Sequence, residues 1–112
     1  MKKTLLILII FISCKKENES PAVPVMRNIK YEASVRNSLC IDVNYDGSNY
    51  HSIKTLRWDY TFQKEVGASL SLSGQACDYI PGREIVLSIY QDGQLIQTKS
   101  GSGLESLTYT VK

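Results

Sequence analysis

Apolar and polar residues alternate along most of the chain that follows residue 27. Ile29, Tyr31, Ala33 and Val35 alternate with polar residues, and a period of two is typical of a β-strand with one buried face. The same period returns several times before the C-terminus. Strands are therefore predicted over residues 28–36, 39–45, 52–58, 68–73, 84–90, 94–99 and 106–111, with further apolar positions between 60 and 66.

Short turn sequences separate these segments. Asp46-Gly47 marks one turn, and Asp92-Gly93 suits a type I′ hairpin, in which both turn residues need positive φ. Residues 74–82 are predicted to be a loop, and Gly101-Ser102-Gly103 a further turn. No segment has a helical period. About seven short strands in this length predict an all-β, immunoglobulin-like antiparallel β-sandwich, with Trp58 and Phe62 in its core; a small barrel is the alternative.

The first residues follow a different pattern. Met1-Lys2-Lys3 is basic, residues 4–12 are almost wholly apolar, and Ser13-Cys14 leads into a charged, proline-containing stretch. A basic start, an apolar run and a small residue before a cleavage point are typical of a secretory signal. The run is shorter than the roughly 20 residues that a membrane-spanning helix needs.

Phe11-Ile12-Ser13-Cys14 resembles the lipobox of bacterial lipoprotein signals, with Phe11 where the family prefers Leu. The resemblance implies cleavage before Cys14, lipid modification of its thiol, and a membrane anchor in the bacterial cell envelope. The alternatives are an ordinary cleaved signal or an uncleaved anchor. The predicted organisation is a signal peptide over residues 1–13, a lipidated tether over 14–27, and a β-sandwich domain over 28–112.

Composition limits the partners of the mature chain. Lys2 and Lys3 are two of the 13 basic residues and leave with the signal, so 11 remain against 11 acidic residues. A chain near neutrality, without a basic stripe interleaved with aromatics, is not expected to bind nucleic acid. Apart from Cys14, the chain has two cysteines, Cys40 and Cys77. Because an exported chain folds in an oxidising compartment, a disulfide is favoured over two free thiols. The strand phase points Cys40 outward and places Cys77 in a loop, so a surface bridge is expected.

The residues predict no catalytic site, no metal site and no cofactor. His51 is the only histidine, the carboxylates are scattered, and the serines alternate outward on strands, so a non-enzymatic domain is expected. Tyrosines near strand ends often form contact surfaces, because they offer a large area at a low entropic cost. A partner contact would include the following residues, although packing at a sheet edge explains them equally: Tyr50, His51, Trp58, Tyr60 and Tyr79.

The order of several motifs is similar to the soluble domain of the MmpS family, membrane-anchored accessory proteins of RND-type transporters. The motifs are Lys54-Thr55-Leu56-Arg57-Trp58, Leu70-Ser71-Leu72-Ser73, Ile89-Tyr90-Gln91-Asp92-Gly93 and Ser102-Gly103. The resemblance covers residues 28–112 and implies a sandwich fold and docking on an integral membrane complex. The chain departs from the family in its lipoprotein signal, where members carry an uncleaved helix, and in Arg57, where a proline is common.

Two functional hypotheses follow. The first is a lipid-anchored accessory protein that docks on a membrane protein complex, such as an RND-type transporter. The second is a surface-exposed binding module for a glycan, a peptide or a host protein. The identity of the membrane, its leaflet and the oligomeric state stay open, since an exposed edge strand can pair with a second copy.

Overall fold

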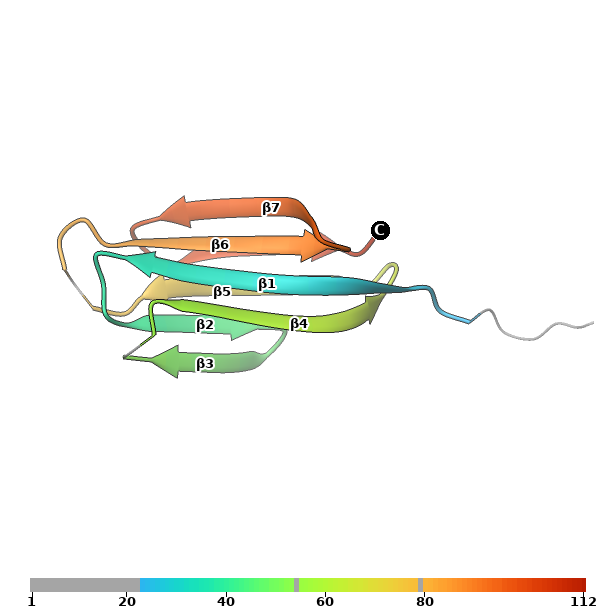
Figure 1. Cartoon of the computed structure of the whole chain (residues 1–112), viewed down its shortest axis with the longest axis horizontal. Helices are drawn as coiled ribbons and strands as arrows, with labels where there is room; N and C mark the ends of the chain where they lie inside the picture. The colour runs from blue at the N-terminus through green and yellow to red at the C-terminus, as the bar shows by residue number, and fades with distance from the viewer. Residues whose placement is uncertain (1–22, 54, 79) are drawn as a thin grey trace, which may run out of the picture.

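The computed structural model describes residues 23–53, 55–78 and 80–112. Over these residues the chain forms eight β-strands and no helix (Figure 1). The strands are β1 (Met26–Arg36), β2 (Ile41–Tyr45), β3 (Ser48–Ser52), β4 (Arg57–Glu65), β5 (Ser69–Ala76), β6 (Glu84–Gln91), β7 (Gln94–Gly101) and β8 (Glu105–Thr110).

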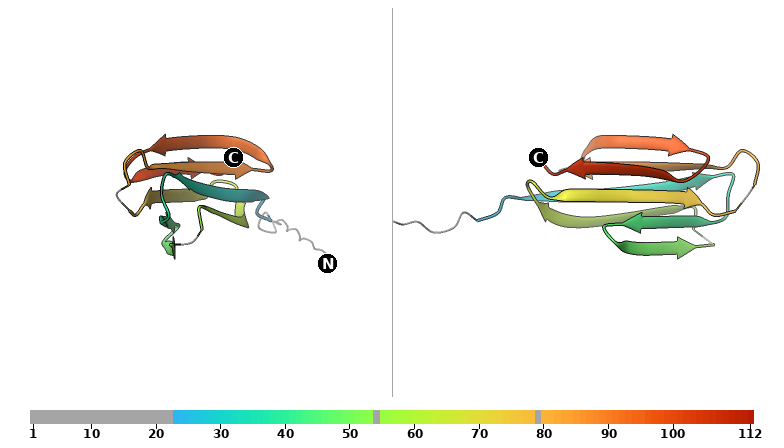
Figure 2. Two further views of the ribbon diagram at one scale, coloured as in Figure 1. Left: turned by 60° about the vertical axis from the view of Figure 1, so that its left-hand side comes forward. Right: turned by 180° about the vertical axis from the view of Figure 1, so that it is seen from behind.

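The strands form two antiparallel sheets that face each other, which confirms the predicted β-sandwich. One sheet has the order β4-β1-β6-β7 and the other the order β3-β2-β5-β8. Figure 2 shows both sheets in an oblique view and from behind. The described residues contain eight strands where about seven were expected. As in immunoglobulin domains, two antiparallel sheets pack face to face, but the order of the strands differs. Constant-type immunoglobulin domains have their first, second, fourth and fifth strands in one sheet, whereas β1 here shares a sheet with β4, β6 and β7.

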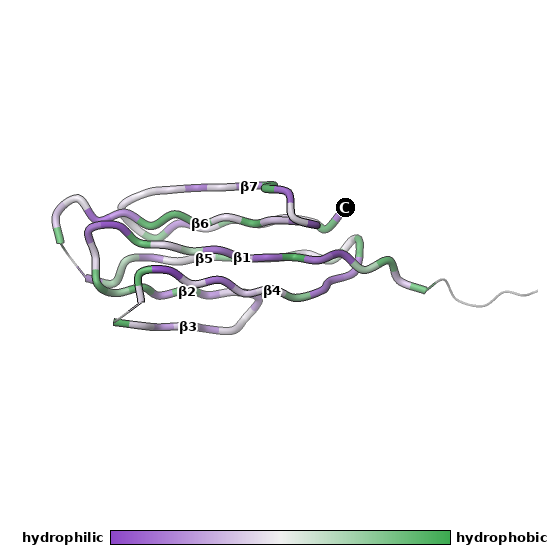
Figure 3. Tube along the Cα trace, in the orientation of Figure 1, coloured by the Kyte–Doolittle hydropathy of each residue, from purple (hydrophilic) through white to green (hydrophobic). Residues whose placement is uncertain are grey.

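The predicted alternation becomes the core between the sheets. On β1, the side chains of Ile29, Tyr31 and Ala33 are 1% exposed or less, and β6 contributes Leu87 and Ile89 in the same way. The alternation of polar and apolar residues along β1 is visible in Figure 3. Burial of each large aliphatic side chain contributes about 1.5–3 kcal/mol, so these inward positions are the main source of stability.

Two Asp-Gly pairs make the tight hairpins. Asp46 and Gly47 have φ values of 50° and 85°, and Asp92 and Gly93 have values of 51° and 83°. Positive φ at both central residues defines the type I′ turn, whose twist matches that of the flanking strands. The predicted hairpin at Asp92-Gly93 is confirmed, and the turn at Asp46-Gly47 is of the same kind.

The predicted strand over residues 52–58 is wrong. The structure instead has β3 over Ser48–Ser52 and begins β4 at Arg57. The tight turn at Asp46-Gly47 returns the chain at once, so β3 pairs with β2 from Tyr45↔Ser48 onward. β3 lies at a sheet edge and has no fully buried residue. Its sequence therefore lacks the apolar alternation by which the other strands were found.

The predicted loop over residues 74–82 starts too early, because β5 continues to Ala76. Gly74 is the cause of this difference. A Cβ at Gly74 would lie 3.0 Å from the backbone oxygen of Asp42 and 3.2 Å from Cδ2 of Leu87. The glycine here permits close packing between strands and does not mark a turn.

The outer face of the sheet β4-β1-β6-β7 is organised around Glu32. Its carboxylate accepts hydrogen bonds from Nη2 of Arg57 at 2.9 Å and from the hydroxyl of Tyr90 at 3.1 Å, and it pairs with Nζ of Lys30 at 3.3 Å. Burial opposes ionisation of Glu32, but the donors on Arg57, Lys30 and Tyr90 outweigh it and lower the pKa below its ordinary value.

This network gives the fold a pH dependence. Because the folded state lowers the pKa of Glu32, its stabilisation is present above the unfolded pKa and is lost as the pH falls through the lower folded value. We expect Glu32→Gln to lower the urea midpoint at pH 7. The deficit should shrink as the pH falls below the unfolded pKa of Glu32 and through its lower folded value. Glu65→Gln, an exposed carboxylate at the end of β4, controls for the loss of one surface charge. A deficit of Glu32→Gln that stays constant over this acid range would contradict the role of this ion pair.

Candidate functional site

Aromatic side chains occupy alternate positions on the edge strand β4. Trp58, Tyr60 and Phe62 pair with the inward-facing Ala33, Tyr31 and Ile29 of β1, so all three point toward the opposite sheet. Since β4 is the last strand of its sheet, these rings are covered on one side only. Tyr60 is 43% exposed, and Trp58 and Phe62 are half-buried.

Two tyrosines of the opposite sheet complete the cluster. The ring of Tyr45, at the end of β2, lies 4.9 Å from that of Trp58 and 5.0 Å from that of Tyr60. Tyr50 on β3 stacks on Trp58 at 5.8 Å. We call the five rings the aromatic edge, which consists of Tyr45, Tyr50, Trp58, Tyr60 and Phe62. It closes the side of the sandwich where β3 and β4 are the edge strands.

The hydroxyl of the core residue Tyr31 fixes the turn below this cluster. Its ring packs edge-on against Phe62 at 5.0 Å and against Tyr45 at 6.4 Å. Its hydroxyl donates to Oδ2 of Asp46 at 2.7 Å, and Oδ1 of Asp46 accepts from the backbone N–H of Ser71 at 2.9 Å. Burial, reinforced by Asp46, raises the pKa of Tyr31 above its ordinary value, so the hydroxyl stays a donor.

Exposed aliphatic residues extend the aromatic edge beyond Trp58. Ile53 and Leu56 lie in the connection between β3 and β4 and are 66% and 47% exposed. Tyr50 and Trp58 stack near the ends of the two strands that this connection joins. Exposed apolar side chains that gather in one patch are typical of an interaction site.

The structure separates the five residues that were predicted to contact a partner. It brings together Tyr50, Trp58 and Tyr60, places His51 on the other face of β3, and Tyr79 lies outside the described residues. Sequence reasoning missed Tyr45 and assigned Phe62 to the core. Phe62 could have been assigned to the cluster because it lies two residues from Tyr60 on the same strand. Tyr45 joins the cluster only because the two sheets pack together.

Cys40 and Cys77 form a disulfide at the end of the sandwich where β1 ends. Their Cα atoms are 5.2 Å apart, and Cys77 N–H donates to the carbonyl oxygen of Cys40 at 3.2 Å. The bridge joins neighbouring strands of one sheet, because Cys40 precedes β2 and Cys77 follows β5 at the paired positions Ile41↔Ala76. Both cysteines are half-buried, in keeping with the predicted surface position of the bridge.

His51 lies beside this disulfide. It pairs with Asp42 across the β2–β3 ladder, and its Nδ1 contacts Oδ1 of Asp42. The same nitrogen lies 4.0 Å from Sγ of Cys77. The sequence predicted no metal site, and His51 lies on β3. The cross-strand register instead gathers one histidine, two cysteines and one aspartate on a single outer face.

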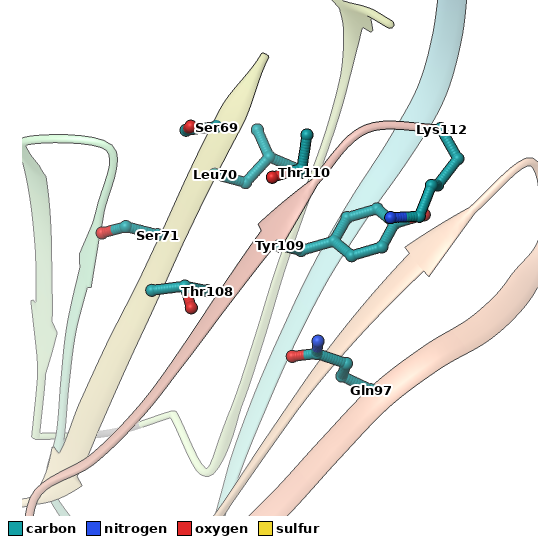
Figure 4. Close-up of a pocket in the computed structure, with 8 residues that line it drawn as sticks. All are labelled: Ser69, Leu70, Ser71, Gln97, Thr108, Tyr109, Thr110 and Lys112. Atoms are coloured by element: carbon teal, nitrogen blue, oxygen red, sulfur yellow. The ribbon is translucent and has the colours of Figure 1, made fainter. Parts of the chain in front are cut away.

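A groove of about 570 Å³ lies on the opposite side of the sandwich (Figure 4). Its lining offers hydroxyl groups from β5 and β8, together with Gln97, Tyr109 and Lys112. Tyr109 donates its hydroxyl to Oε1 of Gln91 at 2.8 Å, which fixes the ring in place. The side chains of this lining offer no carboxylate or imidazole group.

No protein-family model matches the chain, and no curated protein matches it. Within residues 23–53, 55–78 and 80–112, no helix has the length and apolar character needed to cross a membrane. The interpretation of the aromatic edge therefore depends on its geometry. The predicted signal peptide and Cys14 lie outside the described residues.

Proposed function

We propose that the chain is a bacterial envelope lipoprotein whose sandwich is a non-enzymatic docking domain, and that the aromatic edge contacts a membrane protein complex. The lipobox at Cys14 supports the anchor, and the motif order supports an RND-type transporter as the partner class. The observation that carries the proposal is the half-exposed aromatic edge. Tyr and Trp are enriched where protein interfaces hold most of their binding energy.

The position of the aromatic edge suits docking close to a membrane. From Cys14 to Met26 the chain spans at most about 40 Å when fully extended. Phe62 pairs near the start of β1, at Ile29, and Trp58 lies farther along the same strand. The row of rings therefore runs from the tether end of the domain outward. β3 and β4, the edge strands of the two sheets, flank it, and an edge strand can accept an added strand from a partner.

In-cell cross-linking of the full-length, acylated chain tests the docking function. Affinity recovery and mass spectrometry should then yield an integral membrane complex in stoichiometric amount. The Cys14→Ala chain, which lacks the anchor, should lose this partner. Recovery of abundant envelope proteins alone would refute the accessory function. Glycan and peptide arrays probed with Cys14→Ala would then test the alternative, because an external ligand needs no anchor.

We expect Tyr60→Ala to weaken recovery of that partner by about 30-fold, which corresponds to a contribution of about 2 kcal/mol. Tyr60 is suited to the test because it is the most exposed of the rings on β4 and contributes least to the core. Thr108→Ala, an exposed position on β8 at the other side of the sandwich, is the matched control. Unchanged recovery with Tyr60→Ala would remove the aromatic edge from the interface while leaving the docking function itself intact.

A further inference from the structure

The outer face of the sheet β3-β2-β5-β8 gathers four side chains of the types that bind zinc. Cys40, His51 and Cys77 place one ligand atom each within 4.8 Å of one another, and the carboxylate of Asp42 touches His51. Each comes from a different segment. Cys40 precedes β2, Asp42 lies on β2, His51 on β3, and Cys77 follows β5.

We infer that reduction of the disulfide converts this cluster into a site for a thiophilic divalent cation of the Zn²⁺ class, with Cys40, Cys77, His51 and Asp42 as its ligands. Two cysteines, one histidine and one carboxylate match the ligand types and the coordination number of four that zinc prefers. Thiolate ligands select against hard cations such as Mg²⁺ and Ca²⁺. This inference does not depend on the proposed docking function.

The ligand atoms of Cys40, Cys77 and His51 lie within 4.8 Å of one another, close to the spacing of tetrahedral coordination. The carboxylate of Asp42, which contacts Nδ1 of His51, turns toward the ion to supply the fourth ligand. With Zn–S bonds of about 2.3 Å and Zn–N bonds of about 2.0–2.1 Å, neighbouring ligand atoms lie about 3.5–3.8 Å apart. Nδ1 of His51 is already 4.0 Å from Sγ of Cys77. Once the S–S bond is broken, rotation of the two cysteine side chains separates the sulfur atoms to about 3.5–3.8 Å. Strands β2 and β5 need not move.

The protein holds the two cysteines side by side by contacts other than the disulfide. The β2–β5 ladder reaches Ile41↔Ala76, next to both cysteines. The carboxylate of Asp78 accepts hydrogen bonds from the hydroxyl of Ser38 and, at 3.0 Å, from the backbone N–H of Leu39. These hydrogen bonds hold the segment before Cys40 against the segment after Cys77. The reduced thiols therefore stay close enough to bind one ion.

The steps balance in electrons and protons. A cellular dithiol supplies two electrons and two protons, which break the S–S bond and give two thiols, while the dithiol becomes a disulfide. The cation then binds the two sulfur atoms as thiolates, which releases both thiol protons. His51 coordinates through Nδ1 as the neutral tautomer that carries its proton on Nε2. Where the free side chain holds that proton on Nδ1 beside Asp42, the proton moves through solvent to Nε2, so the imidazole neither gains nor loses a proton.

The full-length chain carrying Cys14→Ala tests the inference, since its only thiols are Cys40 and Cys77. After reduction by a phosphine, Zn²⁺ is titrated in competition with a chromophoric chelator. We expect one Zn²⁺ per reduced chain, bound at least about 100-fold more tightly than by the oxidised chain. Co²⁺ in place of Zn²⁺ should show thiolate charge-transfer absorption. A reduced, folded chain that binds no more tightly than the oxidised one would overturn the inference.

His51→Ala separates the four-ligand site from a simple pair of thiols. It should weaken Zn²⁺ binding at least tenfold in the reduced chain, and Asp42→Asn should weaken it as well. Asn49→Ala, an exposed position on the same strand, is the control. Unchanged affinity in His51→Ala would refute the site. If reduction unfolds the chain, recovery of the β-sheet circular dichroism on addition of Zn²⁺ supports the inference, and no recovery overturns it.

Discussion

Replacing both Cys40 and Cys77 by alanine is expected to lower the free energy of unfolding by about 4 kcal/mol. The two residues are 37 positions apart, and the loop that they close contains β2, β3, β4 and β5. In the chain-entropy account, closing a loop of this size removes about 13 cal/mol/K from the unfolded chain, which is about 4 kcal/mol at 25 °C. For a domain of this size, such a loss is a large part of the total stability.

Urea unfolding of the double variant in the Cys14→Ala background measures this loss. The midpoint should fall, and the slope of the transition should increase because the unfolded chain becomes less compact. Reduction of the Cys14→Ala chain in the absence of metal should reproduce the effect. A loss below about 1 kcal/mol would show that residual contacts already restrain the unfolded chain without the disulfide.

The alternation of residues was sufficient to predict the inner faces of most strands. The positions Ile29, Tyr31, Leu70 and Leu87 are all buried, because a strand that packs on one face must repeat with a period of two. The prediction of β3 was wrong because the period of two arises only where one face of a strand is buried. An edge strand that buries little carries no such pattern, and only the tight turn at Asp46-Gly47 shows where it begins.

The candidate sites were less predictable than the fold, because they depend on contacts between sheets and on register. Tyr60 and Trp58 could be grouped from their spacing on one strand, whereas Tyr45 joins them from the opposite sheet. His51 gave no sign of its neighbours, since Cys77 is 26 positions away. A single histidine is unremarkable until the order β3-β2-β5 places it beside the two cysteines.

Tyr31→Ala is expected to cost about 3–5 kcal/mol, the range found for removal of a large buried aromatic side chain. Tyr31 is fully buried and contacts the rings of Phe62 and Tyr45 from the core side. Its loss therefore leaves a cavity below the aromatic edge as well as an unpaired oxygen on Asp46. Urea unfolding followed by the fluorescence of Trp58, the only tryptophan, reports on both the core and the aromatic edge.

Tyr31→Phe separates the ring from its hydroxyl. It should cost about 1–3 kcal/mol, because the carboxylate of Asp46 loses a charge-assisted hydrogen bond while the packing stays. The fluorescence of folded Trp58 should change in Tyr31→Ala and stay close to the wild type in Tyr31→Phe. Equal losses in the two variants would mean that the bond to Asp46, and not the volume of the ring, holds the β2–β3 turn against the opposite sheet. The aromatic edge would then owe its shape to that single contact.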